Sequence, residues 1–231
     1  MAAEREETHS SSPVVIAEEE DRPALSDHAL QALKEFLSEQ SSAAGGSSEE
    51  VRLVTEDWRL SQFWYDRETA VIVTNEIRSL WDSASSPVAC VACPTIYAYL
   101  KKLSPDIPVQ LLEYDRRFEQ YGSDYIFYDY NLPKLLPTEL RHAYKIIVVD
   151  PPYLSKECLE KVADTISYLA QGEEHFLLLL TGEVQRENAA SLLKAYPCGF
   201  RPQHSNKLGN EFRLFTNYDP GERLLAWEPL I

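Results

Sequence analysis

The chain is short of basic residues. Its 231 residues include 22 Lys and Arg against 37 Asp and Glu, which gives a formal net charge of −15. A protein that holds nucleic acid through its phosphates needs the opposite balance, because neutralising phosphates and releasing counterions supplies much of that affinity. The composition therefore disfavours nucleic acid as a partner and favours a basic protein.

Cysteine is also scarce. The four cysteines are too few and too scattered for a disulfide framework in a chain of this length: Cys90, Cys93, Cys158 and Cys198. Cys90 and Cys93 form a C-x-x-C pair, which is half of a zinc site. No second pair follows at zinc-ribbon spacing, however, and "PVACVACP" has the character of a buried strand. We therefore expect a structural role for the pair and no metal.

Long hydrophobic runs are missing as well. No run of about 18 apolar residues occurs, so we expect no membrane-spanning helix. The first residues, "MAAEREETHSSS", have no apolar core of the kind found in a signal peptide. These absences predict a reduced, cytoplasmic protein that does not enter membranes, and we expect it to act as a monomer.

Three segments differ in composition. Residues 1–24 are rich in Glu, Ser and Ala, lack aromatic residues and are predicted to be a disordered acidic tail. Residues 25–50 contain a predicted helix, "LSDHALQALKEFLSEQ" with Ser26 as N-cap, and then the flexible linker "SSAAGGSSEE". We expect this helix to pack on its own domain; the alternative is that it docks on a partner. Residues 51–231 are predicted to form the main domain.

The main domain alternates helical patterns with short apolar runs. The predicted strands are "VACVAC" (88–93), "VQLLEYD" (109–115), "YIFYDYN" (125–131), "KIIVVD" (145–150) and "HFLLLLT" (175–181). Between them lie helical patterns such as "DRETAVIVTNEIRSLW", with Asp66 as N-cap, and "SKECLEKVADTISYLA". Runs that are apolar on both faces and separated by helices predict an α/β fold with a parallel sheet covered on both sides. The segment "CGFRPQHSNKLGNEFRLFTNYD" (198–219) predicts a closing antiparallel hairpin, with Gly209 and Asn210 in its loop.

Acidic residues stand at three successive strand ends. Glu113 and Asp115 end one strand, Asp129 the next and Asp150 the one after. In open α/β sheets ligands bind beyond the carboxyl ends of the strands, and an acid at the second strand suits the two hydroxyls of a ribose. Asp129, one strand on, suits the exocyclic amine of an adenine. Single acids at strand ends are also common turn and cap residues, so the prediction depends on their joint placement.

The stretch "DPPY" supplies two fixed acceptors and an aromatic face. Pro151 and Pro152 have no N–H and hold the backbone extended, so the segment offers the Asp150 carboxylate and the Pro151 carbonyl in set directions. Two such acceptors suit an amine and leave its lone pair free. Tyr153 adds a ring to stack on a base or to cover a cationic amine. The alternative, a strand merely stopped by prolines, is disfavoured by the acid-ended strands upstream.

These motifs resemble those of amino-directed, S-adenosylmethionine-dependent methyltransferases. D-P-P-[YFW] after a central strand is their signature, and "LSQFWYDRETA" resembles the Q-[FY]-x-[TY] segment ahead of their sheet, at Gln62, Phe63, Trp64 and Tyr65. More closely, "LSQFWY", "LLEYDRRF", "YIFYDYN", "DPPYLS", "NEFR" and "NYD" are similar to one eukaryotic family across nearly the whole chain from about residue 25. That family was first labelled N6-adenine DNA methyltransferase and is now described as the lysine methyltransferase of translation elongation factor 1-alpha.

The resemblance implies a fold and a site. The fold is Rossmann-like, with a mostly parallel seven-stranded sheet and an antiparallel C-terminal strand. The cofactor is S-adenosylmethionine, and the residues implied to bind it are Gln62, Phe63, Tyr65, Cys93, Pro94, Glu113, Asp129 and Asp150. Glu113, or Asp115 two residues later, takes the ribose and Asp129 the adenine. The acceptor amine belongs to a catalytic group formed by Asp150, Pro151, Pro152 and Tyr153.

The sequence departs from this resemblance at one point, and it leaves three possible functions. The first strand usually ends in a Gly-rich turn, whereas here the turn reads "ACPTIYAYL", so Cys93, Pro94 and Thr95 must replace the glycines, with the helix start after Pro94 facing a carboxylate of the cofactor. The favoured function is methylation of a lysine in elongation factor 1-alpha. The alternatives are N6-adenine methylation of DNA or RNA, and a methyltransferase fold reduced to a non-catalytic binding module.

Overall fold

A computed structural model describes residues 53–206 and 209–228 of the chain, all within the compact unit Glu50–Ile231. The expected acidic tail and N-terminal helix, residues 1–50, lie outside the described residues, and both stay predictions.

Seven strands form one sheet in the order β3-β2-β1-β4-β5-β7-β6. Their bounds are Val88–Val91 (β1), Val109–Glu113 (β2), Tyr125–Phe127 (β3), Ile146–Val149 (β4), Phe176–Gly182 (β5), Tyr196–Pro197 (β6) and Phe212–Thr216 (β7). The first five strands pair in parallel, whereas β7 runs antiparallel to both of its neighbours, β5 and β6. The α/β fold with a mostly parallel sheet and an antiparallel C-terminal strand is therefore confirmed.

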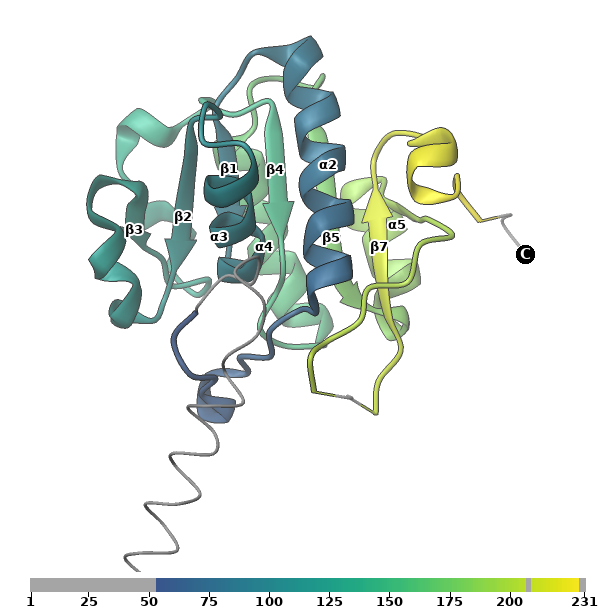
Figure 1. Cartoon of the computed structure of the whole chain (residues 1–231), viewed down its shortest axis with the longest axis horizontal. Coiled ribbons are helices and arrows are strands. Elements are labelled where there is room, and N and C mark those ends of the chain that lie inside the picture. The colour runs from purple at the N-terminus through teal and green to yellow at the C-terminus, as the bar shows by residue number, and fades with distance from the viewer. Residues whose placement is uncertain (1–52, 207–208, 229–231) are drawn as a thin grey trace, which may run out of the picture. The chain divides into compact units, whose positions relative to one another are not determined.

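Helices cover both faces of the sheet, α2 and α3 on the face nearer the viewer of Figure 1 and α4 and α5 on the other. They span Arg67–Ala84 (α2), Pro94–Leu103 (α3), Lys156–Leu169 (α4) and Arg186–Leu193 (α5). Short 3-10 turns cover Trp58–Leu60 (η1), Arg116–Asp124 (η2), Pro133–Leu135 (η3), Thr138–Leu140 (η4), Glu183–Gln185 (η5) and Gly221–Leu224 (η6). In β4, Ile146 and Val148 pack toward α2 and α3, and Ile147 and Val149 toward α4. Alternate residues thus meet two apolar layers, which is why this strand has no polar face.

Capping residues fix where the helices begin. Asp66 caps α2 as predicted, since its carboxylate accepts a hydrogen bond from the Thr69 N–H at 2.8 Å. Ser155 caps α4, and its hydroxyl accepts from the Cys158 N–H at 3.2 Å. The link from β4 to α4 is therefore only residues 150–155, which holds the "DPPY" stretch at the carboxyl end of the sheet.

The predicted hairpin is shifted. Its first strand, β6, precedes the expected segment, and the long connection to β7 pairs elsewhere. The N–H of Phe200 bonds to the Leu224 carbonyl at 3.1 Å, and the Ser205 N–H bonds to the Trp64 carbonyl at 2.9 Å. Because these N–H groups serve the C-terminal turn and the segment before α2, they are not available to extend β6.

The four cysteines are free and buried in the core. In the part of the chain that the structure describes, no group of three or more His, Cys, Asp and Glu is placed to hold a metal. Within the same part, none of the helices has the length and apolar character needed to cross a membrane.

Candidate active site

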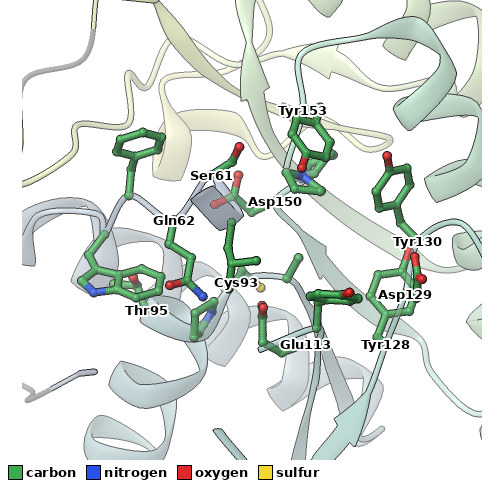
Figure 2. Close-up of a pocket in the computed structure, with 18 of the residues that line it drawn as sticks. Ser61, Gln62, Cys93, Thr95, Glu113, Tyr128, Asp129, Tyr130, Asp150 and Tyr153 are labelled. Carbon is green, nitrogen blue, oxygen red and sulfur yellow. The ribbon is translucent and has the colours of Figure 1, made fainter. Parts of the chain in front are cut away.

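A cavity of about 320 Å³ opens at the carboxyl ends of the parallel strands. Its wall consists of residues 60–64, which precede α2, 92–95 after β1, 113–114 at the end of β2, 128–131 after β3 and 150–153 after β4. In Figure 1 the segment before α2 lies beyond the arrowheads of these strands, and Figure 2 shows their side chains around the cavity. The volume is within the range of small-molecule sites.

The structure brings most of the predicted site residues together. Those lining the cavity are Gln62, Phe63, Trp64, Cys93, Pro94, Glu113, Asp129, Asp150, Pro151, Pro152 and Tyr153. Tyr65 is the exception. Its ring stacks on His204, with centroids 4.4 Å apart, and its backbone forms an isolated bridge with the same residue. This pairing turns Tyr65 into the core behind the cavity, with its hydroxyl beside Asp150 rather than in the lining.

Glu113 and Asp115 have different surroundings. Glu113 faces the cavity and is 7% exposed; its carboxylate accepts the Asp115 N–H at 3.1 Å. Burial raises the pKa of Glu113 to about 7. Asp115 is outside the lining, and although burial opposes it, hydrogen bonds from Arg117 and Gln62 lower its pKa. Of the two acids, Glu113 is the one placed to accept a ligand.

Asp150 stands at the other side of the cavity. Its N–H donates to the Val91 carbonyl at 3.0 Å, which holds the backbone in the sheet while part of the side chain faces the cavity. Dense packing around the carboxyl raises its pKa well above the ordinary value; the nearby Tyr65 hydroxyl opposes this rise, and the nearby Glu113 adds to it. No ion pair among residues 53–206 and 209–228 includes Asp150 or Glu113. Asp129 forms none either, so three carboxyl groups of the cavity wall have no ion pair in the described part of the chain.

The turn after β1 works without glycine. Ala92 takes a left-handed conformation, with φ of 53°, and its N–H donates to the Leu112 carbonyl at 2.8 Å. Cys93 then precedes α3 without a side-chain cap, and Pro94 is the first helical residue. The free N–H groups of this helix start are next to the cavity, which Pro94 and Thr95 line. Burial raises the pKa of the Cys93 thiol, so the thiol is neutral.

Several lining residues were not predicted from the sequence. They are Leu60, Ser61, Ala92, Tyr114, Tyr128, Tyr130 and Asn131. Tyr130 packs edge-on against Tyr153, with ring centroids 5.9 Å apart, so the acceptor side has two aromatic walls. Asn131 donates its backbone N–H to Asp129 at 2.9 Å and fixes that carboxylate. Tyr130 and Asn131 directly follow Asp129 in the sequence, and this was the one signal that could have predicted their place in the cavity wall.

Comparisons with known proteins place the chain in a family. Residues 56–220 match a family model described as "Probable N6-adenine methyltransferase". EEF1A lysine methyltransferase 1 of Mus musculus is 44% identical over 210 residues, which is 89% of this chain and 96% of that protein. The Gallus gallus protein of the same name is 45% identical over 212 residues (88% and 98%), and the Homo sapiens one 41% over 209 residues (88% and 96%). The chain therefore belongs to the methyltransferase family that contains EEF1A lysine methyltransferase 1.

Proposed function

We propose that this protein transfers the methyl group of S-adenosylmethionine to the side-chain amine of a lysine in translation elongation factor 1-alpha. The observation that carries the proposal is family membership, because relatives 41% and 45% identical over 88% of the chain are named for this activity. The cavity supports it, with acidic strand ends on one side and the stretch Asp150–Tyr153 on the other.

The residues present fit a cationic nucleoside cofactor. Glu113 would hold the ribose hydroxyls, Asp129 the adenine amine, and the start of α3 at Pro94 a carboxylate group. The three carboxyl groups of the wall, Glu113, Asp129 and Asp150, make the cavity favourable for positive charge. When bound, S-adenosylmethionine supplies a methyl group on a positively charged sulfur. No glycine is needed at Ala92, since this residue itself takes the left-handed conformation.

The acceptor amine fits between Asp150 and the aromatic pair. Asp150 and the Pro151 carbonyl would accept its hydrogens, and neither proline can offer a competing N–H. Tyr153, 45% exposed at the rim, and Tyr130 beside it would exclude water from the amine. Holding the lone pair toward the methyl group is the main contribution to the rate that these residues can make.

A lysine must also lose a proton before it can react. With an ordinary pKa of ~10.4, neutralising it near pH 7 costs on the order of 4 to 5 kcal/mol. In its ionised form Asp150 would favour this step, because burial raises its pKa and makes the carboxylate a stronger proton acceptor than an exposed one. Exclusion of water by Tyr130 and Tyr153 would in addition lower the pKa of the lysine itself, because the charged amine loses its hydration.

Adenine methylation is the second candidate. The description of the matching family model favours it, and an adenine amine would occupy the same acceptors. The net charge of −15 favours a basic protein instead. A non-catalytic binding module is the third reading; it predicts cofactor binding without turnover.

One assay separates the three. The purified chain is given labelled S-adenosylmethionine with either recombinant elongation factor 1-alpha or an adenine-containing oligonucleotide. We expect label on a lysine of the protein and none on the oligonucleotide, with the Asp150→Asn variant as the inactive control. Label on the oligonucleotide alone would refute the lysine assignment. Cofactor binding by calorimetry with no label on either would favour the binding module.

A further inference from the structure

The segment before α2 forms one side of the cofactor cavity. Residues 57–64, called the cover segment below, contribute lining residues 60–64 and lie beyond the ends of the strands (Figure 1). Its far end is fixed, since the Trp64 N–H donates to Glu56 at 2.7 Å and the Trp64 carbonyl accepts from Ser205 at 2.9 Å. Among the described residues, the backbone hydrogen bonds of its middle stay within the segment, where Leu60 and Gln62 donate to Asp57 and Ser61 donates to Trp58. Side chains must therefore attach this part to the rest of the domain.

Gln62 is the buried centre of the cover segment. It is 6% exposed, and both ends of its amide are occupied. Its Nε2 donates to Asp115 at 2.9 Å, while its Oε1 accepts from the Asp57 N–H at 3.0 Å and from Arg117 at 2.8 Å. The oxygen is therefore committed to holding the segment, and the amide works mainly as an anchor between the segment and the region after β2.

Arg117 makes the largest set of these bonds. Its Nε donates to both Asp115 oxygens, at 3.1 and 2.8 Å, and its terminal nitrogens donate to Gln62 and to the Thr55 carbonyl at 2.9 Å. One planar guanidinium thus joins the end of β2 to two points of the chain before α2. A lysine has no such fork and cannot make these bonds together.

The same group reaches the cavity wall through the backbone. The Asp115 N–H donates to the Glu113 carboxylate at 3.1 Å, so the acid that we assign to the ribose is bonded to the residue that anchors Gln62. Neither Asp115 nor Arg117 lines the cavity. They are placed to orient groups that touch the ligand, without touching it themselves.

We propose that Asp115 and Arg117 are positioning residues of the cofactor site, which hold Gln62, and with it the cover segment, closed over the end of β2. The proposal depends on the proposed function only for the identity of the ligand. It assigns a role to "YDRRF" that differs from ligand contact: releasing Arg117 should open one wall of the cavity and loosen the cofactor.

The first test compares Arg117→Met, Arg117→Lys and a matched control, Arg116→Met, in the full chain. Arg116 is the neighbouring residue, but its guanidinium pairs with Glu119 and lies over Phe127 instead. By calorimetry with S-adenosylmethionine, Arg117→Met should raise Kd about tenfold, the order expected for one or two charge-assisted hydrogen bonds. The kcat at saturating cofactor should stay within about threefold, and the control should match wild type. Arg117→Lys should have a melting temperature close to wild type, but its Kd should stay raised as in Arg117→Met, because charge alone does not hold Gln62.

A second measurement needs no cofactor. Trypsin cleavage after Arg59, whose side chain is 88% exposed, reports opening of the cover segment, and cleavage after Lys134 in η3 serves as an internal reference. Without cofactor, Arg117→Met should raise the Arg59 to Lys134 cleavage ratio several-fold, and Arg116→Met should leave it unchanged. An unchanged ratio, an unchanged Kd, or recovery of Kd in Arg117→Lys would each overturn the proposal. Failure of wild type to bind S-adenosylmethionine would refute the proposed cofactor, while the cleavage ratio would still decide the role of Arg117.

Discussion

Burial raises the pKa of two carboxyl groups in the cavity, Asp150 and Glu113, and Glu113 is the clearer case. Burial raises its pKa from 4.5 to about 7, and the charge of Arg117 offsets only part of this rise. Because the folded chain holds this proton more tightly than the unfolded chain, ionising Glu113 opposes folding. A ligand with a positive charge and ribose hydroxyls would stabilise the ionised form of Glu113. Binding of such a ligand should therefore stabilise the folded chain.

The first prediction follows from this linkage. Between pH 4.5 and about 7 the folded state binds more protons at Glu113 than the unfolded state, so stability should fall as pH rises through that window and level off above it. Glu113→Gln removes this contribution. In urea unfolding, wild type should lose on the order of 3 kcal/mol relative to Glu113→Gln between pH 5 and pH 8. Parallel curves for the two proteins would contradict the raised pKa.

The second prediction concerns Asp150 and Tyr153, and it separates positioning of the acceptor amine from binding of the cofactor. Asp150→Asn replaces a carboxylate oxygen with an N–H donor, so kcat should fall steeply; cofactor Kd should change far less, because Glu113 and Asp129 keep their carboxyl groups. Tyr153→Phe should keep most of the activity and Tyr153→Ala should lose it, because the ring, and not the hydroxyl, excludes water from the amine. Steady-state kinetics with elongation factor 1-alpha test both. Equal activity of the Phe and Ala variants would remove Tyr153 from the acceptor wall.

For single residues, the sequence predicted which residue types form the site better than it predicted where their side chains point. Acids at strand ends and "DPPY" located Glu113, Asp129 and Asp150, since the ends of parallel strands meet at one edge. The choice between Glu113 and Asp115 needed the structure. Asp115 is the N-cap of η2 and its side chain accepts from Arg117, which turns it away from the cavity.

Whole elements were easier to predict than their ends. The apolar runs and the Asp66 cap correctly indicated β4 and α2, because burial on two faces and capping are local signals. The run 125–131 was too long: β3 stops at Phe127, and the residues after it leave the sheet to form the cavity wall. Aromatic residues such as Tyr128 and Tyr130 are as common in a strand as in a cavity wall, so their pattern could not show that β3 ends at Phe127.

The third prediction concerns the turn between β1 and α3. A left-handed alanine costs about 1 to 2 kcal/mol more than a glycine there, partly offset by the greater freedom of glycine in the unfolded chain. Ala92→Gly should therefore stabilise the fold by about 0.5 to 1 kcal/mol in urea unfolding and leave cofactor Kd within about twofold. Ala98→Gly, in the middle of α3, should instead destabilise by about 1 kcal/mol. Destabilisation by both changes would mean that the Ala92 methyl group has a packing role that outweighs the strain of its φ of 53°.

At the scale of the whole molecule the net charge dominates. With 37 acidic against 22 basic residues, the chain presents a negative field to any partner, and that field reaches only about 10 Å into a 0.1 M salt solution. Such a field speeds encounter with a basic protein and slows encounter with nucleic acid. The N6-adenine label of the matching family model and the lysine methyltransferase names of the relatives thus imply opposite salt responses.

The last prediction uses that opposition. Raising NaCl from 50 to 300 mM should increase KM for elongation factor 1-alpha several-fold, because screening weakens the attraction between an acidic enzyme and a basic substrate. The kcat and the cofactor Kd should change far less, since the cavity is buried and its carboxyl groups are screened little by salt. Steady-state kinetics across the salt series, with cofactor Kd measured in parallel, test both halves. A KM that falls as salt rises would mean that enzyme and substrate repel one another, and the basic-partner interpretation of the charge of −15 would then be wrong.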